Sequence, residues 1–302
     1  MKESFLTQLE HITDSTCIHV QEPMSRHTTF RVGGPADVLV TPDRGSIAAI
    51  IKLCRSENVP YTLIGNGSNL LVSDKGVRGV VIEMGEHAGE IRVTQNEITA
   101  QAGALLSKIA NTAAKEGLTG MEFAAGIPGS LGGAVVMNAG AYGGEMKDIL
   151  VSAVVLDENG EEKTLSADEL ELRYRHSCIS EKHYIVLEAT IRLQSGDEQE
   201  IRLKMKELSE QRQEKQPLQY PSAGSTFKRP EGYFAGKLIM DAGLRGYTVG
   251  GAQVSEKHCG FVINKGDATA EDICKLMQDV SEKVQEQFGV VLEPEVKQIG
   301  EF

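Results

Sequence analysis

The sequence predicts an α+β protein with two or three lobes, and three observations support this fold class. The chain has 302 residues, which is more than one typical hydrophobic core accommodates. Strand patterns follow one another in clusters with few helices between them, whereas a doubly wound parallel sheet requires regular alternation. The composition, with 40% hydrophobic and 25% charged residues, is that of an ordinary globular protein.

The first two thirds of the chain are expected to be rich in strands. Apolar residues at positions 47, 50, 51 and 54 predict a helix over 43–59. A second helix is expected over 104–116, where Gly117 ends it. Short apolar or alternating segments predict strands at 36–42, 61–65, 77–84, 90–94, 96–103, 149–157 and 183–193.

A long polar helix is expected to precede the last domain. It covers 197–215, and Pro217 ends it because proline lacks the N–H group that a helix needs. Residues 221–230 have the composition of a loop. Further helices are expected at 234–242 and 270–288, and further strands at 261–264 and 290–300. The predicted domains are 1–72, 73–200 and 201–302.

Charge and hydropathy exclude several classes of protein. The formal net charge of −12 repels polyanions, so nucleic-acid binding is not expected. No segment has the apolar length of a membrane span, and the N-terminus lacks the apolar core of a signal peptide. The acidic segments 157–171 and 196–200 have the composition of solvated turns and helix starts. We therefore expect a cytoplasmic protein without a membrane partner.

The cysteines are expected to be free and buried. They are odd in number and never spaced as Cys-x-x-Cys, which argues against a disulfide framework and against a structural zinc site. No metal site is predicted. The five are Cys17, Cys54, Cys178, Cys259 and Cys274.

A first glycine-rich segment, residues 65–70 (GNGSNL), follows a predicted strand. Glycines let main-chain N–H groups approach an anion, as in a phosphate-binding turn. A Rossmann fingerprint would need a third glycine at position 70 and a helix beginning there. Leu70 instead begins another apolar run, which argues against an NAD-dependent Rossmann dehydrogenase. The alternative is an ordinary tight turn between strands.

A second glycine-rich segment, residues 124–142, contains five glycines and Pro128 before a helix of small residues. Such a backbone surface lets a large planar ligand approach. Ser130 is placed to cap the helix, whose N-terminus would favour a pyrophosphate. The alternative is tight packing of a helix on a sheet by small residues.

Seven segments in order resemble the UDP-N-acetylenolpyruvoylglucosamine reductases (UDP-N-acetylmuramate dehydrogenases), over nearly the whole chain from about residue 25. They are 31–36, 65–71, 125–143, 173–177, 224–230, 241–264 and 292–296. The resemblance implies a vanillyl-alcohol-oxidase-like (PCMH-type) FAD-binding fold of two subdomains, followed by an α+β substrate domain. The short gap after Arg175 resembles the form of the family that lacks an extra substrate-covering loop.

The resemblance also implies the activity. It is the NADPH-dependent reduction of UDP-N-acetylglucosamine enolpyruvate to UDP-N-acetylmuramate through FAD, in peptidoglycan precursor synthesis for the bacterial cell wall. No separate Rossmann unit is visible, so NADPH is expected to reduce the flavin and leave before the UDP-sugar takes its place. The implied FAD-binding residues are Gly65, Asn66, Gly67, Ser68, Asn69, Leu70, Ala125, Gly126, Pro128, Gly129, Ser130, Gly132, Gly133 and Asn138.

Three catalytic residues are implied by the same resemblance. Hydride delivery to C3 of the enol ether leaves negative charge at C2 that spreads into the neighbouring carboxylate, so the site needs a cation, a proton donor and exclusion of water. Arg175 would grip the carboxylate through two parallel N–H bonds. Glu295 would assist if held protonated, since removal from water raises the pKa of a carboxyl group. Ser225 would give the proton to C2. By themselves, these residues have simpler alternatives: a surface ion-pair partner, an edge-strand charge and a turn residue.

Five further residues are candidates for binding the UDP-sugar, which needs positive charge for its diphosphate and an aromatic face. They are Tyr142, Tyr174, Arg212, Lys228 and Lys297. Arg229 stands where the family commonly has asparagine. His258 either orients the site or has a structural role.

Two other functions remain open at this point. A flavin-dependent alcohol oxidase of the same superfamily would reoxidise rapidly in air and would not need Arg175. A non-catalytic nucleotide-binding regulator would bind without turnover and would leave the pattern of Arg175, Ser225 and Glu295 unexplained. The sequence leaves the oligomeric state open and is compatible with a monomer.

Overall fold

The computed structural model describes residues 2–302, which form two compact units of mixed α and β structure. The chain passes between the units several times, so neither is one continuous stretch of sequence. Unit 1 comprises the residues up to His19, Val38–Asn66 and Gly79–Arg212, and unit 2 comprises Val20–Asp37, Gly67–Arg78 and Gln213–Phe302. The division into 1–72, 73–200 and 201–302 stays a prediction.

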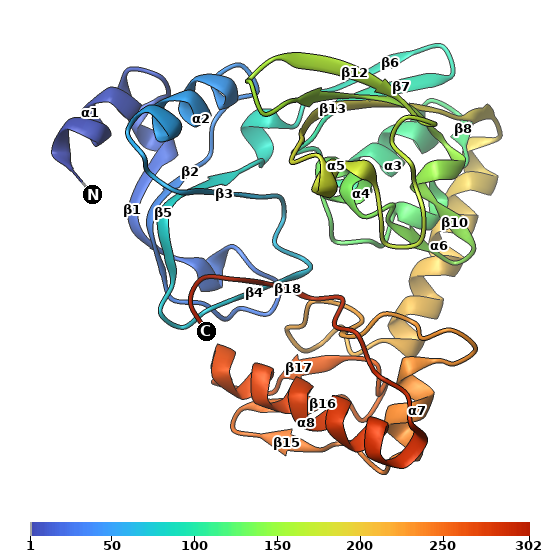
Figure 1. Ribbon diagram of the computed structural model, residues 1–302. Helices are drawn as coiled ribbons and strands as arrows, with labels where there is room; N and C mark the ends of the chain where they lie inside the picture. The colour runs from blue at the N-terminus through green and yellow to red at the C-terminus, as the bar shows by residue number, and fades with distance from the viewer. Residues whose placement is uncertain (1) are drawn as a thin grey trace. The chain divides into compact units, whose positions relative to one another are not determined.

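A five-stranded antiparallel sheet with the order β12-β11-β13-β7-β6 lies in unit 1. On the central strand β13, Val186, Leu187, Ala189 and Ile191 are buried. Two helices, α3 (Leu106–Lys115) and α4 (Leu131–Val136), pack against the sheet through β7 and β13 (Figure 1). The strands are β6 (Ile91–Thr94), β7 (Glu97–Gln101), β11 (Leu150–Leu156), β12 (Glu162–Ser166) and β13 (Ile185–Arg192).

A second sheet has the order β1-β2-β5-β3, with β3 parallel to β5. Helix α2 (Ile47–Ser56) buries an apolar face and contacts α1 (Glu3–Glu10), whose Phe5 and Leu9 are buried in the same core. The strands are β1 (Ile18–Pro23), β2 (Pro35–Val40), β3 (Tyr61–Ile64) and β5 (Val77–Glu83).

In unit 2, helix α8 (Ala270–Phe288) covers a small antiparallel sheet of β15 (Thr248–Val249), β16 (Ala252–Val254) and β17 (Val262–Asn264) (Figure 1). Thr269 and Asp272 form a capping box at its start, and Gly289 ends it in the left-handed conformation with φ 68°. Both signals are local in sequence, and the predicted helix over 270–288 is confirmed residue for residue.

The remaining elements are short or connect the others. A parallel pair joins β4 (Leu70–Val72) to β18 (Lys297–Ile299). The long helix α6 (Glu198–Lys215) and the helix α7 (Ala235–Asp241) agree with the expected ranges. The others are β8 (Leu118–Thr119), β9 (Gly140–Ala141), β10 (Gly144–Glu145), β14 (Gln194–Ser195), α5 (Cys178–Glu181) and the 3₁₀ helices η1 (Ser15–Cys17), η2 (Met24–Arg26), η3 (Glu86–Ala88), η4 (Glu122–Ala124) and η5 (Met146–Asp148).

Three expectations about local structure are wrong. The strand expected over 290–300 is limited to Lys297–Ile299, because Pro294 has no N–H group for a ladder and forms only an isolated bridge with Phe227. The helix expected from residue 43 begins at Ile47, since the Asp43 carboxylate accepts N–H bonds from Gly45 and Ser46 and forms a turn first. The acidic segment 157–171, expected as solvated turns and helix starts, contains the edge strand β12.

Other expectations concern cysteines, metals and membranes. All five cysteines are free; four are buried and Cys274 is partly buried. Within residues 2–302, no cluster of three or more histidine, cysteine, aspartate or glutamate side chains is placed to hold a metal ion. The same residues include no helix with the length and apolar character needed to cross a membrane.

Candidate active site

The two glycine-rich segments meet within unit 1 through Gly65 and Asn66. A Cβ atom at position 65 would overlap the hydroxyl group of Ser130, so only glycine fits there without movement. The side-chain amide of Asn66 donates a hydrogen bond of 2.7 Å to the carbonyl oxygen of Pro128. The structure therefore brings two of the predicted FAD-binding segments together.

Helix α4 uses its first N–H groups inside the protein. Leu131 donates to the carbonyl of Ala104 and Gly132 to that of Ala102, both at 2.8 Å. Ser130 occupies the N-cap position, but its side chain makes no capping hydrogen bond, so the expected cap is wrong; its hydroxyl faces Gly65 instead. These first two amides are not available to a pyrophosphate, and Gly132 allows close packing against Ala102, which follows β7.

A cavity of 350 Å³ opens in unit 1 beside the junction of the two segments. Its lining includes Asn66 from the first segment, Gly103 and Leu105 after β7, and the polar side chains of Glu83 and Lys108. Pockets for small molecules typically measure about 300–1,000 Å³. Its carboxylates can accept hydrogen bonds from hydroxyl groups, and its lysine can attract an anion.

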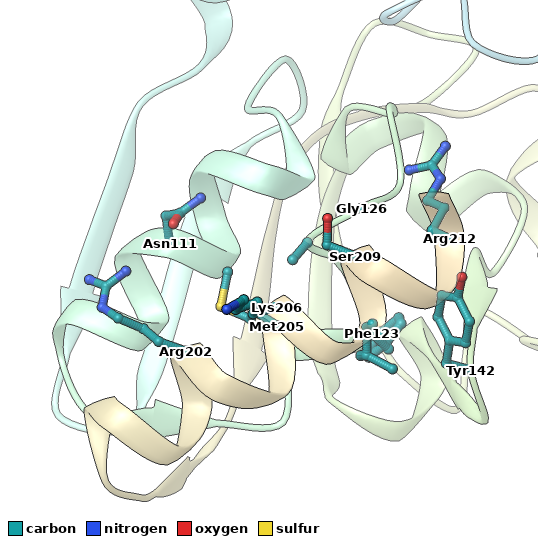
Figure 2. Close-up of a pocket in the computed structure, with 11 residues that line it drawn as sticks. Asn111, Phe123, Gly126, Tyr142, Arg202, Met205, Lys206, Ser209 and Arg212 are labelled. Atoms are coloured by element: carbon teal, nitrogen blue, oxygen red, sulfur yellow. The ribbon is translucent and has the colours of Figure 1, made fainter. Parts of the chain in front are cut away.

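A second cavity, of 330 Å³, lies along helix α6 in unit 1 (Figure 2). Tyr142 and Arg212, both predicted to bind substrate, line the same end of it, and Arg202 lies at the other end. A Cβ atom on Gly126 would lie 3.2 Å from a guanidinium nitrogen of Arg212, so this arginine lies against the second glycine-rich segment. Burial lowers the pKa of Arg212 from its ordinary value.

Arg175 occupies a tight turn in unit 1. The N–H group of Arg173 donates to the carbonyl of His176 and the reverse bond is also made, each at 3.1 Å, so Tyr174 and Arg175 form the tip. Arg175 has φ 54°, and its guanidinium carbon lies 5.2 Å from the centroid of the Tyr174 ring. This left-handed backbone conformation is compatible with the tip of a tight turn.

Asn138, predicted to bind FAD, makes its side-chain hydrogen bonds within the protein. It is 1% exposed. Its amide group donates to the Glu145 carboxylate at 2.7 Å and to the carbonyl of Arg173 at 3.2 Å, and its oxygen accepts from the N–H group of Lys147 at 2.9 Å. These bonds support the turn that carries Arg175.

In unit 2, the segments that carry Ser225 and Glu295 are hydrogen-bonded together. The N–H group of Glu295 donates to the carbonyl of Thr226 at 2.9 Å, and Thr226 donates to the carbonyl of Gly260 at 2.9 Å. Ser225 is exposed, whereas Glu295 is 7% exposed. Two of the three predicted catalytic residues thus lie on neighbouring segments of the chain. Arg175 belongs to the other unit, so the convergence of all three stays a prediction.

The other predicted residues of unit 2 have varied surroundings. Gly67 has φ 60°, and a Cβ atom there would overlap the carbonyl oxygen of His27. Lys228 forms an ion pair with Glu293. Lys297 is exposed on β18.

His258 and Arg229 make local contacts. The Nδ1 atom of His258 accepts the N–H group of Gly260 at 3.1 Å, and its ring meets that of Phe261 edge to face with centroids 5.0 Å apart. Burial lowers the pKa of His258. These contacts favour the structural interpretation of His258. The guanidinium carbon of Arg229 lies 3.9 Å from the centroid of the Phe234 ring.

Some residues of the site were not predicted from the sequence. The main chain of Thr226 is hydrogen-bonded to Gly260 on one side and to Glu295 on the other. No local sequence pattern distinguishes this threonine. Met205 and Ser209 line the cavity along α6 (Figure 2). An apolar residue in an otherwise polar helix was the available signal for Met205, and Ser209 had none.

Comparisons with known proteins match two parts of the chain to family models. Residues 35–166 match the model of an FAD binding domain. Residues 216–299 match the model described as UDP-N-acetylenolpyruvoylglucosamine reductase, C-terminal domain. The class is therefore that of an FAD-binding oxidoreductase.

Relatives define the family. The chain is 57% identical to the UDP-N-acetylenolpyruvoylglucosamine reductase of Agathobacter rectalis and 53% identical to that of Caldanaerobacter subterraneus, in both cases over the whole of both chains. The crystal structure of UDP-N-acetylenolpyruvylglucosamine reductase from Thermus caldophilus matches with a TM-score of 0.81 and 36% identity, over 94% of this chain and 100% of that one. The chain belongs to the UDP-N-acetylenolpyruvoylglucosamine reductase family. The resemblance found in the sequence and the predicted α+β FAD-binding fold are confirmed.

Proposed function

We propose that this protein reduces UDP-N-acetylenolpyruvoylglucosamine to UDP-N-acetylmuramate with electrons from NADPH, in the synthesis of bacterial peptidoglycan precursors. The observation that carries the proposal is the 57% identity to a reductase of that name over the whole of both chains. Bound FAD supplies hydride transfer from NADPH to the enol ether. A cytoplasmic location, where NADPH and UDP-sugars are held, is part of the proposal.

The FAD is held where the two glycine-rich segments meet. Gly65, Asn66 and the residues around Pro128 supply a close-packed main-chain surface. The cavity lined by Asn66, Glu83 and Lys108 takes the nucleotide part of the cofactor. The predicted FAD-binding residues Ala125, Gly126, Gly129 and Gly133 belong to the same unit and are assigned to this surface, mainly through their main chains, because glycine allows a ligand to approach the backbone closely.

Ser225 gives a proton to C2 of the substrate, and Glu295 assists as an acid. The exposure of Ser225 lets a substrate reach its hydroxyl group, and the bond from Glu295 to Thr226 supports the nearness of the two residues. The buried Glu295 supplies a carboxyl group on the segment that is hydrogen-bonded to the Ser225 loop. A serine hydroxyl is a weak acid, so it needs such neighbours to stabilise the alkoxide it leaves.

Arg175 binds the carboxylate of the enolpyruvyl group and stabilises the negative charge that develops there. A guanidinium group matches a carboxylate with two parallel N–H bonds, which a lysine cannot do. Its place at the tip of a turn closed by two main-chain hydrogen bonds supports a fixed position for its main chain.

The UDP part of the substrate is bound by cations and aromatic rings. Tyr142 and Arg212 line one cavity, which supports their joint assignment. Tyr174, Lys228 and Lys297 are further candidates; Lys228 would have to exchange its partner Glu293 for a phosphate.

An absorption spectrum of the purified protein tests the function. We expect a yellow protein that NADPH bleaches and that only the enolpyruvyl UDP-sugar recolours in the absence of oxygen. Rapid recolouring by air with no response to the sugar would favour an alcohol oxidase instead. A protein that binds the sugar but never turns over would favour a regulator, and a protein that cannot take up flavin would exclude the proposal.

A further inference from the structure

The two asparagines of the first glycine-rich segment have different partners. Asn66 donates to the carbonyl of Pro128 within unit 1. Asn69, three residues later, donates from its side-chain amide to the carbonyl oxygen of Glu295 at 3.0 Å within unit 2. One asparagine therefore supports the second glycine-rich segment, and the other contacts a proposed acid.

Asn69 holds the Glu295 segment at two points. Besides the side-chain bond to Glu295, its carbonyl oxygen accepts the N–H group of Lys297 at 2.9 Å. The second bond opens the parallel pairing of β18 with β4, in which Lys297 lies opposite Leu70. The main chain on the C-terminal side of Glu295 is thus fixed by Asn69.

The other side of Glu295 is fixed by Thr226. The N–H group of Glu295 donates to the carbonyl of Thr226. Thr226 is 1% exposed, and its hydroxyl accepts the N–H group of Val262 at 2.8 Å. Because Thr226 follows Ser225 directly, its bond to Glu295 holds the Glu295 segment beside the loop of the proposed proton donor. The side-chain bond from Asn69 holds the carbonyl group of Glu295.

We infer that Asn69 is a positioning residue for Glu295. Its side-chain amide holds the main chain of Glu295, acts on the reaction through the position of the Glu295 carboxyl group, and is not a ligand of the flavin. The Cα–Cβ direction of a residue is set by its own backbone, and Asn69 and Thr226 bind the two backbone polar groups of Glu295. Loss of the Asn69 amide lets the peptide after Glu295 rotate and displaces the acid from Ser225. The inference rests on the proposed role of Glu295.

The test separates the two half-reactions of the purified holoenzyme. Asn69→Ala removes the amide, and Asn69→Asp keeps its shape while replacing the N–H donor with an acceptor. In both variants we expect a normal FAD content and reduction by NADPH within about twofold of the wild type. Reoxidation by UDP-N-acetylenolpyruvoylglucosamine should slow roughly tenfold, the equivalent of about 1.4 kcal/mol, and its pH profile should shift as that of Glu295→Gln does.

Asn66→Ala is the matched control, since it removes the same amide from the same segment. It should lower the FAD content and leave the pH profile of reoxidation unchanged in the molecules that retain flavin. Loss of FAD from the Asn69 variants, or equal slowing of both half-reactions, would overturn the inference. So would a lower melting temperature with normal kinetics, because that result describes a purely structural residue.

A double-mutant cycle distinguishes this inference from the proposed function. When Glu295 is already glutamine, Asn69→Ala should slow reoxidation less than twofold further, since coupled residues are not additive. Fully additive effects would overturn the role of Asn69 alone. A wild-type enzyme that the sugar does not reoxidise, or a Glu295→Gln variant with the wild-type rate, would overturn the proposed function or the proposed acid, and the inference with it.

Discussion

Between Gly65 and Ser130 there is no room for a side chain, because a methyl group at position 65 would overlap the Ser130 hydroxyl. The two residues come from the two glycine-rich segments, 65 positions apart in sequence. The Asn66 bond to the carbonyl of Pro128 lies at the same junction. Gly65 thus permits a close contact between two segments of the same chain, and this contact shapes the surface on which we place FAD.

Gly65→Ala should weaken FAD binding and lower the stability of the protein. Position 65 does not have the positive φ that disfavours alanine, so the cost is steric and not conformational. Because the obstacle is one hydroxyl group that can rotate, the cost falls at the lower end of the range for overpacking, about 1 kcal/mol. Flavin content after dialysis and urea unfolding at neutral pH measure the two effects.

Ser130→Ala should rescue the Gly65→Ala variant. With the hydroxyl removed, the new methyl group would lie 3.5 Å from the Cβ atom of residue 130, which is close to an ordinary contact. Ser130→Ala alone should have little effect, since the side chain makes no capping bond. A double variant as unstable as Gly65→Ala would show that the hydroxyl is not the obstacle.

Ser225→Ala should separate the half-reactions. Flavin reduction by NADPH should stay close to the wild-type rate, and reoxidation by the enolpyruvyl sugar should slow by roughly 10²–10⁴-fold, the usual contribution of a positioned proton donor. Anaerobic stopped-flow spectroscopy measures each rate.

Ser222→Ala is the control for this variant, because Ser222 lies in the same loop and its N–H group bonds to the carbonyl of Thr29 without involving its hydroxyl. Its kinetics should match the wild type. Equal slowing of both half-reactions by Ser225→Ala would exclude the proton-donor role.

Local sequence signals account for the parts of the fold that could be predicted. Helix α8 begins and ends where expected because Thr269 and Gly289 supply its boundaries within a few residues. The strand expected over 290–300 failed because its pairing depends on distant partners, Leu70 to Val72 for its end and Phe227 for its start. No local pattern around Glu295 reveals those partners.

The site shows the same limit. The glycine content of 65–70 and 124–142 predicted two unusual backbone segments, and the structure joins them. The bond between Glu295 and Thr226 links positions 69 residues apart, so only the family resemblance placed Ser225 with Glu295 in advance. The side-chain partners of Asn69 and Asn138 were not predictable, because a motif gives residue types and not the atoms they contact.

The stability of unit 1 should fall in acid partly through Asp157. Its carboxylate accepts the N–H groups of Asn159 and Glu161 and forms an ion pair of 2.6 Å with Lys163. The hydrogen bond with Lys163, followed by these backbone bonds, lowers the pKa of Asp157 from 3.8 to about 2. Since the folded pKa lies below the unfolded one, the contribution is complete above 3.8 and is lost as the pH falls towards about 2.

Asp157→Asn tests this pH dependence. The variant should be less stable than the wild type at neutral pH, and the difference in unfolding free energy should shrink as the pH falls through this window. Urea unfolding at a series of pH values measures it. Glu158→Gln is the control, since it removes a neighbouring carboxylate that has no part in the contact. A difference for Asp157→Asn that is constant with pH would exclude the assignment.

Asn138→Ala should lower the stability of the protein and raise its KM for the enolpyruvyl sugar. The change removes three buried hydrogen bonds, and alanine tolerates the φ of 43° at this position less well than asparagine. A buried polar group left unsatisfied costs about 1–3 kcal/mol. Because one lost bond is to the carbonyl of Arg173, the turn that carries Arg175 loses an anchor, and we expect the KM for the sugar to rise while the rate of flavin reduction by NADPH stays normal.

Asn138→Asp removes the same support of the turn in a second way. It retains an oxygen for the N–H group of Lys147 and tolerates the backbone conformation, but it has no amide to donate to Arg173 or to Glu145, and its carboxylate would repel that of Glu145. Its KM for the sugar should therefore rise as in Asn138→Ala. If Asn138 were instead a flavin ligand, both variants would lose FAD and reduction by NADPH would fail first, so the flavin content of the purified variants decides between the two roles.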